Sequence, residues 1–238
     1  LAVLAPVRDW QLNREEELEY AVEKGIPVPV KKKTAYSVDA NLWGRSVCGG
    51  PVEIEDQEVP TDALEWVKPV LETPDEPVEL TLHFEQGKLT SADVNGTSMA
   101  QSGAALIEQL NNVVGTQGMG IIDQIEDRTI GLKSREYYEC PAALAILNAH
   151  KELENACLPR ELNLLKPTMD QKFAEYAYSA LWHSPAMDAV QAFTQATQGH
   201  VTGWVKIKLY KGGMHVIARK APHGLYQRVQ ATYGRNST

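Results

Sequence analysis

Strict alternation of hydrophobic and polar residues marks two stretches of the chain as β-structure, because successive side chains of a strand point to opposite faces. In the first stretch the apolar positions are Val78, Leu80, Leu82 and Phe84. A partner strand is predicted from Leu89 to Val94, after a turn at Gly87. The second stretch predicts a hairpin with Val205, Ile207 and Leu209 on one strand, Lys211-Gly212-Gly213 as the turn, and Val216 and Ala218 on the other strand.

Helices are predicted where a capping residue precedes apolar positions spaced three and four residues apart. Five helices are expected, and they begin near Asn13, Gly103, Pro141, Thr168 and Ser184. The first three are expected to end at Lys24, Gly115 and about Ala156. Asn13 with Glu16 three residues later is typical of reciprocal capping. In the second helix, Leu106, Leu110 and Val113 share one face.

The remaining chain gives weaker signals. Two strands, from Gly120 to Ile125 and from Thr129 to Leu132, are predicted to flank Asp127-Arg128. Residues 34–75 are rich in Pro, Asp and Glu and show no clear period, so an irregular segment is expected there. Helices and strands are mixed without regular β-α-β alternation. The sequence therefore predicts an α+β fold with a mixed or antiparallel sheet and packed helices.

Charge and composition exclude several classes of protein. The formal net charge is −8, which disfavours a nucleic-acid partner because phosphate binding needs an excess of Lys and Arg. Lys31-Lys32-Lys33 is the one basic cluster of the sequence. No apolar run approaches the roughly 20 residues that span a bilayer, so no membrane association is expected. Three scattered cysteines, without a metal-binding spacing, favour a reducing, cytoplasmic location and no metal site.

A first polar segment runs from Tyr36 to Ser46 and carries two hydroxyls, a carboxylate, an amide and a guanidinium in addition to its aromatic residues. Such a segment offers convergent donors and acceptors to a small polar ligand. The residues alone leave a second interpretation open, in which the segment is a turn network that satisfies its own hydrogen bonds.

A second polar segment, from Asp123 to Tyr138, contains seven charged residues. In a strand their side chains alternate between the two faces. Surface ion pairs and a charged binding wall are both compatible with this pattern, and charges in a strand are costly unless they are paired or solvated.

Nucleophilic catalysis is not indicated by the sequence, and we predict no catalytic side chain. Ser184 precedes Pro185 and is expected to cap a helix, although His183 is its neighbour. Cys48 lies near two glycines but has no obvious base beside it to form a thiolate. Neither a Walker-type phosphate loop nor a His-Glu-x-x-His motif is present.

Taken in order, several segments resemble the argininosuccinate synthase family. The matching motifs are Gly25-Ile26-Pro27-Val28-Pro29-Val30, Tyr36-Ser37-x-Asp39-x-Asn41-Leu42-Trp43-Gly44-Arg45-Ser46, Ile125-Glu126-Asp127-Arg128, Ile130-Gly131-Leu132-Lys133-Ser134-Arg135, Tyr138-Glu139 and Lys208-Leu209-Tyr210-Lys211-Gly212. The resemblance extends from Leu1 to about Gly234. Several long motifs in register are far more specific than any one of them alone.

The resemblance implies a ligase of arginine biosynthesis. In that family ATP with Mg²⁺ activates L-citrulline as a citrullyl-adenylate, pyrophosphate leaves, and the amine of L-aspartate then displaces AMP. The family's nucleotide-binding half, with its phosphate loop, precedes the region that this chain resembles. The chain is therefore expected to supply the citrulline-binding half and to be inactive alone. The family is a cytoplasmic homotetramer.

The resemblance also assigns residues and boundaries. Citrulline contacts are expected at Ser37, Ser46, Glu126 and Tyr138. Glu126 is expected to face the α-ammonium group of citrulline, and the three hydroxyls are expected to face its carboxylate and ureido groups. Possible supporting residues are Asp39, Arg45, Arg128, Lys133, Ser134 and Arg135. Residues 1–10 are expected to end the nucleotide-binding domain with a strand, residues 11–234 to form the synthetase domain, and residues 235–238 to begin an oligomerisation tail. A shortened tail predicts a smaller oligomer than the tetramer.

Four positions depart from the family pattern, namely Cys48, Gln117, Ile121 and Asp127. The family usually has Glu, His, Arg and Asn there, so these departures bear on efficiency and substrate choice. Two alternatives to the leading hypothesis follow. One is a non-catalytic module that keeps the amino-acid pocket, and the other is a ligase for a citrulline-like substrate.

Overall fold

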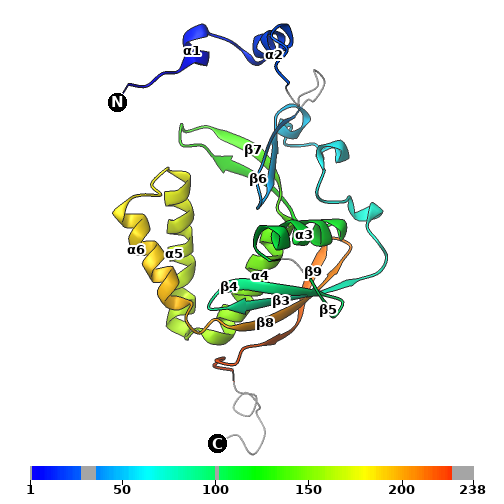
Figure 1. Cartoon of the computed structure of the whole chain (residues 1–238), viewed down its shortest axis with the longest axis vertical. Helices are drawn as coiled ribbons and strands as arrows, with labels where there is room; N and C mark the ends of the chain where they lie inside the picture. Colours follow the sequence, from blue (N-terminus) through cyan, green and yellow to red (C-terminus); the bar gives the residue numbers. More distant parts are fainter. Residues whose placement is uncertain (1, 28–35, 100–101, 227–238) are drawn as a thin grey trace, which may run out of the picture.

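The computed structural model describes residues 2–27, 36–99 and 102–226. These residues form two antiparallel sheets with packed helices, so the predicted α+β class is confirmed (Figure 1). One sheet has four strands and carries the two polar segments. The other has five strands and carries the main hydrophobic core.

The five-stranded sheet has the order β5-β4-β3-β8-β9. Its strands are β3 (Val78–Glu85), β4 (Lys88–Val94), β5 (Thr97–Ser98), β8 (Gly203–Tyr210) and β9 (Gly213–Lys220). Both predicted hairpins are confirmed. The β8–β9 turn has Lys211 at φ 48° and Gly212 at φ 77°. Two consecutive positive φ angles match the right-handed twist of a two-residue hairpin.

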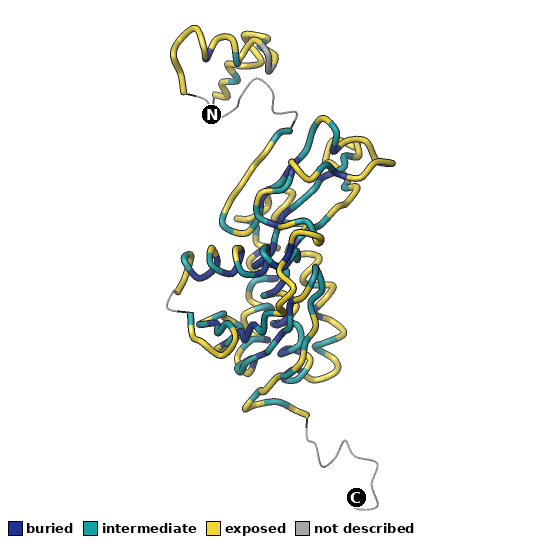
Figure 2. Tube along the Cα trace, turned by 90° about the vertical axis from the view of Figure 1, so that its right-hand side faces the viewer, coloured by how far each residue is buried: buried dark blue, intermediate teal, exposed yellow. Residues whose placement is uncertain are grey.

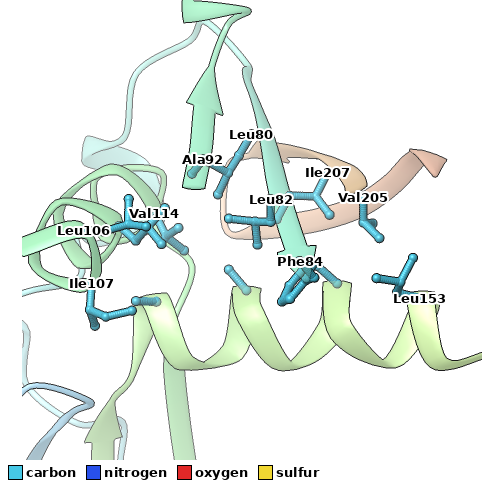
Figure 3. Packing of buried hydrophobic residues seen from close by; sticks show 14 of the residues in the cluster. Leu80, Leu82, Phe84, Ala92, Leu106, Ile107, Val114, Leu153, Val205 and Ile207 are labelled. Carbon is cyan, nitrogen blue, oxygen red and sulfur yellow. The ribbon is translucent and has the colours of Figure 1, made fainter. Parts of the chain in front are cut away.

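Helices α3 (Gly103–Thr116) and α4 (Pro141–Cys157) pack on this sheet and close the core (Figure 3). Leu82, Leu110 and Leu153 are completely buried there. Burying one such side chain stabilises the fold by about 1.5–3 kcal/mol. Within α3 the predicted apolar face is correct at Leu106 and Leu110, but the buried valine is Val114, because residues four apart lie on the same face of a helix.

The four-stranded sheet has the order β1-β2-β7-β6. Its strands are β1 (Ser37–Ala40), β2 (Arg45–Cys48), β6 (Ile121–Asp127) and β7 (Lys133–Glu139). Two predictions were wrong here. Residues 34–75 were expected to be irregular, but they contain the β1–β2 hairpin before three short 3₁₀ turns. The strand expected at Thr129–Leu132 is a turn, and the strand begins at Lys133 instead.

The remaining helices are α1 (Pro6–Trp10), α2 (Arg14–Glu23), α5 (Arg160–Tyr178) and α6 (Pro185–Thr197). The helix predicted to start at Thr168 was wrong, because α5 already begins at Arg160 and passes through Pro167. Proline removes one backbone donor, and here the helix tolerates that loss. Ser184 caps α6 as predicted, since its Oγ accepts the N–H of Met187 at 3.2 Å.

Near the N-terminus the predicted strand is not formed. Ala2, Val3 and Leu4 are exposed and belong to no strand, and the short helix α1 follows them. A strand needs a partner for its backbone groups, and no described residue pairs with this segment. The capping of α2 was correct, because Asn13 Oδ1 accepts the N–H of Glu16 at 3.0 Å and Glu16 Oε2 accepts the N–H of Asn13 at 2.8 Å. Figure 2 shows that this region is almost entirely exposed.

Three predictions from the sequence concern residues outside the described ranges, namely Leu1, the basic cluster Lys31-Lys32-Lys33 and the tail at 235–238. Among the helices that are described, none is both long and apolar enough to cross a lipid bilayer.

Candidate functional site

The two polar segments of the sequence come together in the four-stranded sheet. The first forms β1 and β2, the second forms β6 and β7, and β2 pairs with β7 in the centre. Ser46 lies directly opposite Tyr138, and Glu126 lies opposite Ser134. Residues paired across strands point to the same side, and side chains alternate along each strand.

This register places all four predicted citrulline contacts on one side of the sheet. Ser37 pairs with Cys48, which is two residues from Ser46. Ser134 is four residues from Tyr138 on the same strand. We call this side the hydroxyl face, defined by Ser37, Ser46, Glu126, Ser134, Glu136 and Tyr138. Its four predicted ligand contacts are all partly exposed.

At one edge of the hydroxyl face, Tyr138 and Glu126 form a pair. The phenol of Tyr138 donates to Glu126 Oε2 at 2.8 Å, and the Gln124 amide donates to the same oxygen at 3.3 Å. Burial, and then the hydrogen bond to Glu126, raises the pKa of Tyr138 far above its ordinary value. The phenol therefore remains protonated at neutral pH and serves as a hydrogen-bonding group.

Glu136 lies at the centre of the hydroxyl face and is not among the site residues predicted from the sequence. Its Oε1 accepts from Arg128 Nη2 at 3.0 Å and from Ser134 Oγ at 3.2 Å, and its Oε2 accepts from Ser46 Oγ at 3.4 Å. Arg128 Nε also donates to Ser134 Oγ at 3.0 Å. The charged and hydroxyl residues of β7 are visible in the sequence, but only the strand register shows that Ser134, Glu136 and Tyr138 share a side with Ser46.

Cys48 is a partly exposed thiol on the same side of the sheet, opposite Ser37. Burial, followed by the negative charge of Glu136, raises the pKa of its thiol, and a hydrogen bond with Ser37 opposes this effect. A raised pKa keeps the thiol protonated, and a protonated thiol is a poor nucleophile. Cys48 therefore presents a protonated thiol on this side of the sheet at neutral pH.

Three of the predicted supporting residues lie on the opposite side of the sheet. Arg45 forms a buried pair with Glu139, with 2.6 Å between Nη1 and Oε2. Arg135 binds Asp123 at 2.6 and 2.9 Å and also donates to three backbone carbonyls, those of Val52, Ile54 and Gln57. Lys133 pairs with Asp127 at 2.5 Å near the exposed hairpin tip. These contacts hold the loop after β2 and the tip of the β6–β7 hairpin.

The other supporting residues belong to the hydroxyl face. Arg128 and Ser134 join it through Glu136, and Asp39 is an exposed residue paired with Ser46. The departures from the family pattern divide in the same way. Cys48 shares the hydroxyl face, whereas Ile121 and Asp127 pair with Glu139 and Lys133 on the opposite side.

The fourth departure, Gln117, is buried after α3, where its carbonyl accepts the N–H of Gly212 at 2.8 Å. Its side-chain Oε1 has no hydrogen-bond partner among the described residues. Within residues 2–27, 36–99 and 102–226, no three His, Cys, Asp or Glu side chains are grouped so as to hold a metal ion.

Comparison with known proteins gives a consistent result. The family profile described as "Arginosuccinate synthase C-terminal domain" matches residues 36–238. Curated relatives named argininosuccinate synthase include those of Rubrobacter xylanophilus (48% identical over 238 residues), Dictyoglomus turgidum (47% over 238) and Bacillus subtilis (45% over 233). These matches cover 100%, 100% and 98% of this chain. The chain spans 57%, 58% and 57% of the length of these relatives. The chain belongs to the argininosuccinate synthase family and corresponds to its C-terminal domain.

Proposed function

We propose that this chain is the citrulline-holding part of an ATP-dependent carbon–nitrogen ligase that joins L-citrulline and L-aspartate into argininosuccinate. The observation that carries the proposal is the hydroxyl face, on which Ser37, Ser46, Glu126 and Tyr138 gather from four different strands. Four strands that converge on one polar surface form a more rigid platform than a loop. A rigid platform suits a reaction whose main requirement is orientation.

Each contact matches a group of citrulline. Glu126 Oε1 accepts no hydrogen bond within the described residues, so it is available to the α-ammonium group. Ser46 and Tyr138 donate their hydrogens to Glu136 and Glu126, so their oxygens can accept from the ureido N–H groups, and Ser37 supplies an uncharged partner for the carboxylate. None of these residues acts as a nucleophile. Their contribution is to hold the ureido oxygen in line with the α-phosphate of ATP, and good orientation alone contributes as much as about 7–11 kcal/mol.

ATP with Mg²⁺, and L-aspartate, are proposed to bind mainly through residues outside this chain. The relatives are longer than the chain, and the chain lacks a phosphate loop of the Walker type. We therefore propose that the isolated chain is inactive and acts with a nucleotide-binding half, in a cytoplasmic homo-oligomer. In that assembly the hydroxyl face is expected to lie toward the nucleotide.

The test uses the complete polypeptide that contains this chain. Pyrophosphate release from ATP should require both citrulline and aspartate. Glu126→Gln keeps the size of the side chain but removes its charge, so calorimetry should show weaker citrulline binding and nearly unchanged ATP binding. An equal loss of both affinities contradicts the assignment of Glu126. Citrulline binding without any pyrophosphate release would instead support a non-catalytic amino-acid-binding module.

A further inference from the structure

Glu136 is a buried carboxylate at the centre of the hydroxyl face, where little of its surface is open to a ligand. It lies on β7 between Ser134 and Tyr138, opposite Gln124 of β6, and only 5% of its surface is exposed. Its charge is balanced by Arg128, at 3.0 Å. A buried carboxylate requires such a partner, and this one also reaches two serine hydroxyls.

The hydrogen bonds of the face have a definite direction. A serine hydroxyl has one hydrogen, and Ser46 donates it to Glu136 Oε2, so the lone pairs of Ser46 Oγ remain for a ligand. Tyr138 donates its hydrogen to Glu126 Oε2 in the same way, which leaves its oxygen as an acceptor. Together with the free oxygen of Glu126, these atoms form a group of acceptors beside the guanidinium of Arg128, which donates to Glu136 and Ser134.

We infer that Glu136 is a positioning residue that sets this direction and thereby selects a substrate end group rich in N–H donors, such as an ammonium or a ureido nitrogen. The inference rests on the proposed function and refines it, because it assigns the specificity of the site to a residue that does not touch the ligand. Glu136 acts through Ser46. Arg128 supports it by keeping the buried carboxylate paired.

Glu136→Gln reverses the direction of the central hydrogen bond. An amide has one oxygen, and Arg128 and Ser134 occupy that side of the residue. The NH₂ group then faces Ser46 and donates to it. Ser46 turns its own hydrogen toward the ligand, where it meets an N–H donor. The KM for citrulline should rise about tenfold, which is the scale of one lost hydrogen bond, while the KM for ATP should change less than about twofold.

A double-mutant cycle separates this mechanism from a general structural effect. In the complete polypeptide, the KM values of Glu136→Gln, Ser46→Ala and the double variant are compared. If Glu136 acts through Ser46, the glutamine substitution should raise the citrulline KM less than about twofold once Ser46 is alanine. Glu79→Gln, an identical change on β3 of the other sheet, is the matched control and should leave both KM values unchanged.

The outcomes distinguish a failure of the role inferred for Glu136 from a failure of the proposed ligase function. Citrulline-dependent pyrophosphate release in the wild type, with strongly non-additive effects, supports both. Release in the wild type with additive effects of the two substitutions overturns the role of Glu136 and leaves the ligase intact. If the wild type does not use citrulline, the inference falls with the proposed function. Should Glu136→Gln fold poorly, Glu136→Asp keeps the charge near Arg128 but withdraws the carboxylate from Ser46, so the citrulline KM should still rise, and a KM within about twofold of the wild type overturns the inference.

Discussion

The buried pair of Glu139 and Arg45 should be the most sensitive electrostatic element of the four-stranded sheet. The side chain of Glu139 is completely buried, and that of Arg45 is 9% exposed. Glu139 Oε1 accepts the backbone N–H groups of Glu65, Trp66 and Val67 at 3.0, 2.8 and 2.8 Å. Its Oε2 accepts from Arg45 Nη1 at 2.6 Å. One carboxylate thus anchors a loop and neutralises a buried cation.

Replacing Glu139 with Gln leaves an unsatisfied donor in either orientation of the amide. If the amide oxygen keeps the three backbone N–H groups, the NH₂ group faces the guanidinium of Arg45. If the amide is reversed, the backbone N–H groups of Trp66 and Val67 lose their acceptor, and that of Glu65 keeps only its longer contact, at 3.2 Å. Removing one partner of a buried charged pair typically costs about 3–5 kcal/mol, so we expect a loss of that size in the free energy of unfolding.

The measurement is equilibrium unfolding in urea, followed by circular dichroism, together with hydrogen exchange of the backbone amides at residues 65–67. These amides should exchange much faster in the variant. Glu65→Gln is the control, because the Glu65 side chain is 68% exposed and lies 3.1 Å from Arg45 Nε without the alignment of a hydrogen bond. Its expected cost is at most about 1 kcal/mol. A loss below about 1 kcal/mol for Glu139→Gln, comparable to that control, would refute the reasoning.

Two further predictions concern stability. Ser184→Ala removes the cap of α6, so thermal unfolding should show a loss of about 1 kcal/mol; an unchanged melting temperature would contradict this. Burial lowers the pKa of His150 below its ordinary value near 6.5, although Glu154 opposes the shift. As the pH falls, the imidazole of His150 therefore takes up a proton in the unfolded chain at a higher pH than in the folded chain. His150 thus contributes stability above pH 6.5 that is lost as the pH falls toward the folded-state pKa. The urea midpoint should therefore drop less in His150→Gln than in the wild type between about pH 7.5 and pH 5.5, and equal drops would contradict the role of burial.

Strong local patterns were sufficient to predict much of the fold. The alternation at Val78–Phe84 and the hairpin around Lys211-Gly212 were correct because each strand buries one face against the same core. The start of α5 was missed because Pro167 and Thr168 together imitate a helix N-terminus. Packing of α5 against α6 outweighs the local cost of an internal proline.

The short strands β1 and β2 were missed for a different reason. Each has only four residues, and the short alternation of Ser37-Val38-Asp39-Ala40 in β1 is not repeated in β2. β1 pairs with β2, but β2 is joined to the rest of the sheet through β7, which is about ninety residues away along the chain. Non-local pairing of this kind leaves no trace in a local pattern. The resemblance supplied Ser37 and Ser46, but it did not supply Glu136, whose importance arises from that pairing.

The period of two in β7 gives its residues two separate tasks. Arg135, Tyr137 and Glu139 face the loop after β2 and hold it, whereas Ser134, Glu136 and Tyr138 form the hydroxyl face. Neighbouring substitutions in one short strand should therefore have different consequences. Changes at the first set should lower stability, and changes at the second should alter ligand affinity. The register of β7 against β2 thus connects the two tasks, since a slip by one residue would exchange the sides of the sheet and abolish both.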